Sequence, residues 1–318
     1  LKRSGGCGTL PPRQELEARY PSALWKVEDL MELAEAGAVA VVAVSYCWCS
    51  EEHPDPQGEQ MQVVRNTLRQ FLDGTPLEDV ALFIDWCSLH QKPRSPEEEA
   101  SFERASRSAH LFYLHQGVRA WMLTSPPAAA RIRAPYAGRA WTTFQRALGE
   151  MLTKGNFLLD LGLLDERCTS WDQTVAVCKH RRLPPLTPEA FAEDLSTKIF
   201  MQGMADHDHN FLVQQYEQAF FEAIVAAEEL AFNELGWGDR EAKVLALALS
   251  QCQRLRKITL YGNRIEEDGA LALTQVLSRL RSLEELWLTG NPVGRSRDSK
   301  SRLLDAWARA ERADALRV

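Results

Sequence analysis

Two apolar runs rich in β-branched residues dominate the first half of the chain, and one helix-length segment separates them. The first run covers residues 39–45 and the second covers residues 80–84, and each ends at a polar and aromatic cluster. Between them, residues 58–72 carry apolar side chains at helical spacing and stop at Gly74. This order predicts a parallel β-α-β unit whose polar clusters lie together at the carboxyl edge of one sheet, where such sheets bind ligands.

The alternation of strands and helices continues along the chain. Ser95, a proline and three glutamates form a typical helix start, because acidic side chains complement the positive end of the helix dipole. Further strands are expected at residues 118–124 and 156–161, with a helix over residues 140–152 between them. The predicted fold class of residues 36–180 is therefore α/β, with a flavodoxin-like parallel sheet flanked by helices.

The segments on either side of this domain have a different composition. Residues 1–35 are expected to form a lead-in that is irregular up to Pro21, because it is rich in glycine, proline and charge, and then a short helix. Residues 181–228 carry a helical pattern and are interpreted as a helical connector. One connector helix is expected to end at about Met201, and a longer one to cover residues 208–230.

A repeat with a period of 28 residues follows the connector. Its registered sets include Leu230/Ile258/Leu286, Phe232/Leu260/Leu288, Leu245/Leu273, Leu255/Leu283 and Asn263/Asn291. Apolar residues two positions apart form a short strand, an asparagine turns the chain and a helix returns it, which predicts a short α/β leucine-rich repeat solenoid over residues 229–295. The stretch YGNRIEEDGALAL resembles the ribonuclease-inhibitor subtype. Residues 296–318 are expected to form a C-terminal capping helix, since solenoids need atypical ends.

Composition narrows the classes of function. The formal net charge of −7, with both signs interspersed, provides no basic surface for nucleic acid. The longest uncharged stretch, residues 36–50, is shorter than the about 20 residues that cross a bilayer, so no membrane association is expected. Seven cysteines, an odd number, do not make a disulfide framework and favour a reducing, cytoplasmic setting. Because the chain begins with Leu1, it is expected to be a fragment or a processed product.

The residues that end the first two strands carry a resemblance to a known family. The stretch VAVSYCW is followed by LFIDWCSLHQ and later by RAWTTFQRA. This order resembles the heterokaryon incompatibility (HET) domain, a relative of the Toll/interleukin-1 receptor (TIR) fold. In that family the first strand ends in Ser-Tyr-x-Trp and the second in Ile-Asp-x-x-Cys-x-x-Gln. The matching residues here are Ser45, Tyr46, Trp48, Ile84, Asp85, Ser88 and Gln91, with Cys87 displaced by one place.

The resemblance implies self-association or partner docking through the α/β domain, and it implies NAD as a possible substrate or ligand. TIR-like domains that cleave NAD use a glutamate on the helix after the third strand, four residues beyond a tryptophan. Here the tryptophan is Trp141 and the glutamate position holds Gln145. A neutral amide cannot stabilise developing positive charge as a carboxylate does, so a degenerate catalytic site is expected. Glu150 lies roughly 140 degrees further around the helix and cannot replace it.

An NAD nucleosidase is the alternative function that this resemblance leaves open. Its crevice is expected to be lined by Tyr46, Trp48, Asp85, Ser125 and Trp141. At the end of an apolar strand, Asp85 could bind a ribose hydroxyl or a cation, or it could cap the following loop through backbone amides. Trp141 is also expected to be a core residue, whether or not the domain is an enzyme.

A zinc-binding protein is a second alternative. Cys47, Cys49, His53, Cys87 and His90 follow two neighbouring strands, which would bring thiolates and imidazoles together as zinc requires. Their spacing matches no specific zinc pattern, and buried cysteines beside a loop histidine are the default interpretation. No metal is therefore expected.

The repeats offer a surface for a protein partner. Residues that alternate with the inward leucines face the concave side, and these include Thr259, Tyr261, Trp287 and Thr289. Exposed tyrosine and tryptophan dominate interface energetics, although they could also pack against the connector. The function predicted from the sequence is therefore an intracellular signalling or recognition protein, in which a degenerate HET/TIR-like domain is joined to a repeat that binds a protein.

Overall fold

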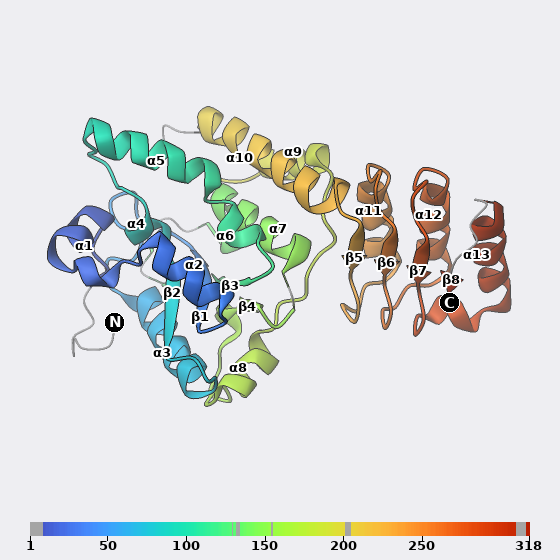
Figure 1. The fold of residues 1–318 in the computed structure, drawn as a ribbon, viewed down its shortest axis with the longest axis horizontal. Helices are drawn as coiled ribbons and strands as arrows, with labels where there is room; N and C mark the ends of the chain where they lie inside the picture. Colours follow the sequence, from blue (N-terminus) through green and yellow to red (C-terminus); the bar gives the residue numbers. More distant parts are fainter. Residues whose placement is uncertain (1–8, 129, 132–133, 154, 201–204, 310–315) are drawn as a thin grey trace. The chain divides into compact units, whose positions relative to one another are not determined.

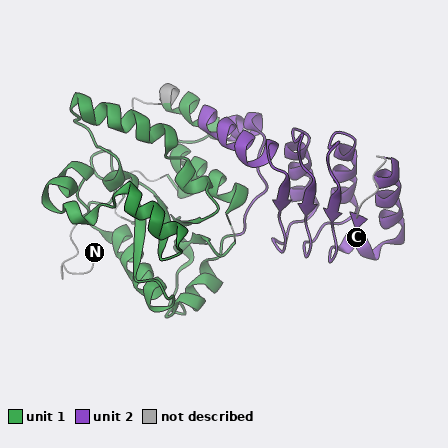
Figure 2. Ribbon diagram, viewed as in Figure 1, with its two compact units in different colours: residues 1–180, 195–212 green, residues 181–194, 213–318 purple. Residues whose placement is uncertain are grey.

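The computed structural model (Figure 1) describes residues 9–128, 130–131, 134–153, 155–200, 205–309 and 316–318. The chain divides into two compact units (Figure 2). The first contains residues 1–180 and 195–212, and the second contains residues 181–194 and 213–318. The segment expected as a separate connector is thus divided between the two units.

The first unit is built on a parallel sheet. Its strands are β1 (Val39–Tyr46), β2 (Asp79–Phe83), β3 (Val118–Leu123) and β4 (Leu158–Asp160), in the order β2-β1-β3-β4 (Figure 1). β1 pairs in parallel with β2 and with β3, which places Ala43 opposite Phe83 and Tyr46 opposite Leu123. The prediction that the two apolar runs are parallel neighbours is therefore confirmed.

Helices pack on both faces of this sheet. α3 (Glu59–Asp73) and α8 (Trp171–Cys178) lie on one face, and α6 (Leu111–Leu114) and α7 (Ala140–Leu152) lie on the other (Figure 1). Because side chains alternate along a strand, Val44 and Trp121 share the face of α3 and pack in one core with Phe71. On the other face α7 comes so close that a side chain at Gly149 would lie 3.1 Å from Leu158.

The remaining elements of the first unit are short helices and turns. They are α1 (Arg13–Arg19), η1 (Pro21–Ala23), α2 (Val27–Glu35), α4 (Asp85–Ser88), α5 (Pro96–Ser108), η2 (Tyr136–Gly138) and η3 (Leu161–Leu163). The expectation of an irregular lead-in up to Pro21 is wrong, because α1 forms there. Ion pairs between residues four apart, Arg13 with Glu17 and Arg19 with Glu15, favour this helix.

The acidic start of α5 forms the cap that its sequence predicts. The Glu98 N–H donates to Ser95 Oγ at 3.3 Å, and the Ser95 N–H donates to the Glu98 carboxylate at 2.9 Å. This reciprocal capping box satisfies two backbone donors that the first helical turn leaves unpaired. The glutamates at this position therefore have a structural role.

The second unit alternates short strands with helices. Its strands are β5 (Glu229–Ala231), β6 (Lys257–Thr259), β7 (Glu285–Trp287) and β8 (Leu316–Arg317), parallel and in this order, and between or after them lie α11 (Asp239–Leu249), α12 (Glu267–Leu277), η5 (Pro292–Arg295) and α13 (Arg297–Arg309) (Figure 1). The strand register pairs Leu230 with Ile258 and Ile258 with Leu286, as the 28-residue period requires. α13 buries Leu303 and Trp307 at the end of this unit.

Helices α9 (Pro188–Ser196) and α10 (Ala205–Phe220), followed by the π-helical turn η4 (Phe221–Val225), contribute to both units. The first expected connector helix ends earlier, at Ser196, and Met201 lies outside the described residues. The second was expected to continue to residue 230, which is wrong because Leu230 pairs in β5. No helix among the described residues combines the length and the apolar character needed to cross a bilayer.

Asn263 joins the backbones of two successive repeats. Its Nδ2 donates to the carbonyl oxygens of Phe232 and Leu260 at 2.7 and 2.8 Å. Its Oδ1 accepts from the N–H groups of Leu235 and Trp237 at 3.0 and 3.1 Å. The side chain is buried, so no water replaces these bonds if it is removed.

We expect Asn263→Ala to lower the free energy of unfolding of the second unit by about 3 kcal/mol, because it leaves buried backbone groups unpaired. Asn233→Ala is the matched control, since Asn233 Oδ1 accepts from the N–H of Tyr261 on the exposed side, and it should cost under about 1 kcal/mol. Urea unfolding followed by circular dichroism measures both variants. Equal losses would contradict the assigned role of Asn263.

Candidate functional site

Hydrogen-bond donors from the end of β1 and from α4 converge on the Asp85 carboxylate at the carboxyl edge of the first sheet. The Tyr46 O–H donates to Asp85 Oδ1 at 2.7 Å, and the Trp48 Nε1–H donates to Asp85 Oδ2 at 3.1 Å. The backbone N–H of Trp86 also donates to Oδ1, at 2.6 Å. The structure thus brings together Tyr46, Trp48 and Asp85, which we call the Asp85 cluster.

The strand register explains why these residues meet. Parallel pairing of β1 with β2 ends at Ala43 and Phe83, and both chains continue past this point in the same direction. Tyr46 and Asp85 therefore reach the same edge of the sheet. Asp85 then begins α4 and accepts the Trp86 amide, which is the capping contact expected as one of its roles.

Burial is the largest influence on the protonation of this cluster. It raises the pKa of Asp85 above its usual value, and the hydrogen bonds to the carboxylate offset part of this increase. Burial, reinforced by Asp85, also raises the pKa of Tyr46 well above its usual value. Burial and the same carboxylate raise the pKa of Cys87 to about 12. Tyr46 therefore remains a hydrogen-bond donor, and Cys87 remains an unreactive thiol.

Gln145 lies on the opposite face of the sheet from the Asp85 cluster. Ser45 precedes Tyr46 in β1, so the two side chains point to opposite faces. Ser45 Oγ donates to Gln145 Oε1 at 2.6 Å and lies 2.6 Å from the Tyr136 hydroxyl, which therefore donates to Ser45. The position of the expected glutamate thus belongs to a chain of neutral hydrogen bonds.

The structure does not join Ser125 and Trp141 to the Asp85 cluster. The Ser125 hydroxyl donates to a backbone carbonyl of η3 at 3.2 Å, and the Trp141 Nε1–H donates to Asp208 Oδ2 at 3.0 Å. Trp141 is 37% exposed, so the expectation that it is a core residue is wrong, whereas its neighbour Phe144 is buried. Helical spacing placed both aromatics on one stripe, but Trp141 lies at the edge of that stripe.

The side chains considered for zinc are engaged elsewhere. They are Cys47, Cys49, His53, Cys87 and His90. No group of three or more His, Cys, Asp or Glu side chains in the described part of the chain could hold a metal ion. Burial raises the pKa of Cys49 to about 11. His53 Nδ1 accepts from the Asp55 N–H, and His90 lies 3.4 Å from Glu17, so the geometry gives no support to a zinc site.

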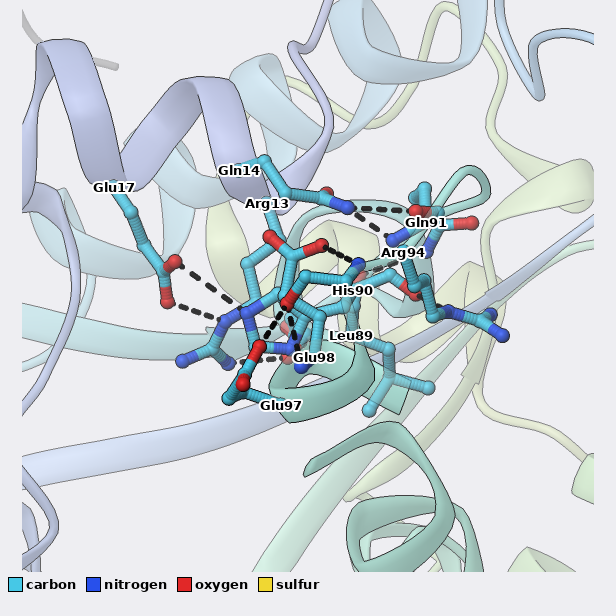
Figure 3. Close-up of polar contacts among 11 residues, drawn as sticks. Arg13, Gln14, Glu17, Leu89, His90, Gln91, Arg94, Glu97 and Glu98 are labelled. Carbon is cyan, nitrogen blue, oxygen red and sulfur yellow. Dashed lines mark hydrogen bonds and ion pairs between the residues drawn. The ribbon is translucent and has the colours of Figure 1, made fainter. Parts of the chain in front are cut away.

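Helix α1 docks on the loop that follows β2, next to the Asp85 cluster (Figure 3). The Arg13 guanidinium donates to the carbonyl oxygen of Ser88 at 2.6 Å. Gln14 Nε2 donates to the carbonyl oxygen of Gln91 at 2.6 Å, and the Gln91 N–H donates back to Gln14 Oε1 at 3.1 Å. One side-chain amide thus pairs with both backbone groups of Gln91. This contact could not be predicted from the sequence, because the helical pattern of α1 does not indicate which segment the helix packs against.

Two further contacts fix the same loop. The Gln91 side chain donates to the carbonyl oxygens of Leu89 and Asp85 at 2.8 and 3.2 Å. The Trp86 Nε1–H donates to the carbonyl oxygen of Leu10 at 2.8 Å. The glutamine of the second signature therefore holds the loop that carries Asp85, and the segment before α1 covers the indole next to it.

A cavity of about 530 Å³ opens beside the end of β1. Its lining comes from residues 49–59, in the loop after β1, and from Pro127, Ala130 and Arg131, in the loop after β3. Asp55 is part of this lining and is 2% exposed. Two lining residues, Cys49 and His53, were considered for zinc, but the sequence did not predict a cavity here. The available signal was a polar, proline-containing loop between a buried strand and a helix, since such loops commonly carry binding residues.

In the second unit, Trp287 lies half-buried between two cations. Lys257 Nζ is 4.7 Å from the ring centre of Trp287, and the Arg317 guanidinium carbon is 4.3 Å from it. The Trp287 Nε1–H donates to Glu285 at 2.9 Å. These contacts hold the indole in one orientation at the strand surface.

Tyr261 lies two residues beyond Thr259, the strand partner of Trp287. It is 40% exposed, and its hydroxyl donates to Glu234 at 2.7 Å. Thr289 is exposed as well, whereas Thr259 is 7% exposed. Of the four residues expected to bind a partner, Thr259 therefore offers the least accessible surface.

Comparison with known proteins adds no relative. A scan against protein-family models finds no family that matches, and a search of curated proteins finds no matching protein. The functional argument therefore depends on the residues and contacts of this chain.

The raised pKa of Asp85 predicts how stability depends on pH. The folded state holds the Asp85 proton more tightly than the unfolded chain, so this residue's contribution to the free energy of unfolding should fall as pH rises above about 4. We expect the stability of the native chain relative to Asp85→Asn to decrease between pH 4 and pH 7. Urea unfolding of both proteins across this range measures the difference and cancels the other titrating groups. A difference that grows with pH would contradict the prediction.

Proposed function

We propose that this chain is an intracellular signalling or recognition protein, in which a catalytically degenerate HET/TIR-like domain is joined to a leucine-rich repeat that binds a protein partner. The observation that carries this proposal is the surface formed by Trp287 and Tyr261. Charged neighbours orient both rings, and both rings keep accessible area. Aromatic side chains oriented in advance lose little conformational entropy on binding and supply much of the binding energy of interfaces.

The sheet of the first unit supports the HET/TIR-like assignment. Its parallel order β2-β1-β3-β4, with helices on both faces, agrees with a flavodoxin-like fold. The two sequence signatures are also in direct contact, because Tyr46 and Trp48 from the first donate hydrogen bonds to Asp85 from the second. Gln91, the last residue of the second signature, holds the backbone of that loop.

The register of the second unit supports the leucine-rich repeat assignment. Strands β5, β6 and β7 pair at an offset of 28 residues, and buried Asn263 and Asn291 occupy equivalent positions. Each asparagine bonds to backbone groups on two successive strand-turn segments. A solenoid with this design presents one face of its strands to partners.

The neutral chain around Gln145 supports a binding role over NAD cleavage. Gln145 accepts from Ser45 and cannot supply the negative charge that stabilises an oxocarbenium-like centre. The Asp85 carboxylate is bonded to Tyr46, whose side chain is on the opposite face of the sheet from Ser45 and Gln145. The two groups therefore cannot share one bound nicotinamide.

The cysteines are in keeping with a cytoplasmic location. Those in the described residues are free and buried, namely Cys47, Cys49, Cys87, Cys168, Cys178 and Cys252. Thiols in this state persist in a reducing compartment. We therefore include a cytoplasmic location in the proposal.

The partner surface is tested by comparing two double variants. We expect Tyr261→Ala with Trp287→Ala to lose a binding protein that the native chain captures from its source cells, with affinity reduced at least about 30-fold, since each interface aromatic contributes 1 kcal/mol or more. The matched control is Leu247→Ala with Leu271→Ala, which removes exposed apolar side chains from α11 and α12. Quantitative mass spectrometry of the captured proteins identifies the partner. If every captured protein is retained equally by both variants, the repeat surface is not the binding site.

The catalytic alternative is tested by incubating the purified chain with NAD and measuring nicotinamide. We expect no release, because loss of one charge-stabilising group lowers rates about 100- to 1,000-fold. Gln145→Glu restores a carboxylate at that position, with Gln145→Ala as its control. Release by Gln145→Glu alone would mark the scaffold of a former NAD-cleaving enzyme, whereas release by the native chain would overturn the proposed binding role.

A further inference from the structure

Two buried oxygen atoms in the segment after β1, one of them on a residue that lines the cavity of the first unit, accept no hydrogen bond from the described residues. They are Asp55 Oδ1 and Gln60 Oε1, and both side chains are 2% exposed. Buried polar atoms are almost always paired, and an unpaired one is costly. Both atoms are acceptors, but only Asp55 lines the cavity, so the cavity lining contains one buried acceptor that lacks a donor.

The orientation of Gln60 is fixed by its neighbours. Its Nε2 donates to the carbonyl oxygens of Cys47 and Pro54 at 2.8 and 3.2 Å. Turning the amide over would place its oxygen against two other oxygens, so Oε1 is the unpaired atom. Asp55 is similarly held, because its Oδ2 accepts from the N–H of Met61 at 2.8 Å. Asp55 Oδ1 is therefore an oriented acceptor in a rigid loop.

The ionisable groups that line the cavity favour a positively charged ligand. Glu52, Asp55 and Glu59 carry negative charge, and Arg131 carries positive charge. His53 adds none in this arrangement, because its Nδ1 accepts from the Asp55 N–H and leaves the ring neutral. The lining is thus net negative, and its least exposed ionisable group is the carboxylate with the unpaired oxygen.

We infer that this cavity binds a small organic cation through its N–H groups, a guanidinium or a primary ammonium, with Asp55 as the principal acceptor. An organic cation fits better than a metal ion, because no cluster of ligating side chains for a metal exists in the described residues. The volume of about 530 Å³ lies in the range of small-molecule sites. This site is in the first unit and is independent of the partner surface proposed for the repeats.

The inference is tested by isothermal titration of the full chain with n-butylguanidinium and with its neutral counterpart n-butylurea. We expect saturable binding of the guanidinium compound and at least about tenfold weaker binding of the urea, because hydrogen bonds to a charged group are the stronger ones. Asp55→Asn keeps an oxygen that can accept from the Met61 N–H but removes the charge. It should weaken n-butylguanidinium at least about tenfold.

Asp79→Asn is the matched control. Asp79 lies outside the cavity and also accepts a backbone N–H, from Val80 at 2.8 Å, so this variant should bind as the native chain does. Ala130→Phe adds a large side chain to the lining, leaves the Asp55 carboxylate in the chain, and provides a second variant should Asp55→Asn fail to fold. It should also abolish binding. No binding by the native chain, equal binding of n-butylurea, or unchanged affinity in the cavity variants would each overturn the inference.

Discussion

The hydrogen bonding of the half-buried Asp85 carboxylate is the interaction on which the carboxyl edge of the first sheet depends. A carboxylate taken out of water is costly unless donors surround it. Here the donors come from Tyr46, Trp48 and Trp86, which lie after two different strands. They reach one carboxylate because β1 and β2 are parallel neighbours in a single register. The strand pairing and the polar cluster therefore stabilise each other, since either alone would leave buried polar groups unpaired.

Helix α1 and the segment before it supply hydrogen-bond partners to the loop that carries Asp85. The loop after β2 turns away from the sheet, so its backbone groups and the indole of Trp86 need partners from another segment. Gln14 pairs with both backbone groups of Gln91, and the carbonyl oxygen of Leu10 accepts from Trp86. This segment has no fully buried side chain in α1, and it is held by these polar contacts together with Leu10 and Leu16, which pack against the core. Its role is to complete the loop that carries the carboxylate.

Helices and strands could be predicted from the sequence where the spacing of their own apolar residues determines which side chains are buried. Helix α7 covers residues 140–152 as expected, and β5, β6 and β7 of the second unit pair at the expected 28-residue offset. The parallel order of the first two strands also predicted that Tyr46, Trp48 and Asp85 lie close together. The position of Trp141 could not be predicted, because it depends on Asp208, more than sixty residues away. The docking of α1 and the unpaired oxygen of Asp55 likewise depend on distant or missing partners, which local patterns cannot reveal.

The alternation of side chains along β1 decides what the first unit can do chemically. Ser45 and Tyr46 are adjacent, yet one joins the neutral chain of Tyr136 and Gln145 and the other binds the Asp85 carboxylate. A site that stabilises a developing cation needs its negative charge and its orienting groups on one side of the ligand. The sheet itself separates them here. The oxygen at residue 145 accepts from the Ser45 hydroxyl, whereas the Asp85 carboxylate accepts from Tyr46, Trp48 and the Trp86 amide. The first unit therefore holds the Asp85 carboxylate and the neutral chain of Gln145 on opposite faces of its sheet, while the aromatic surface proposed to bind a protein is in the second unit.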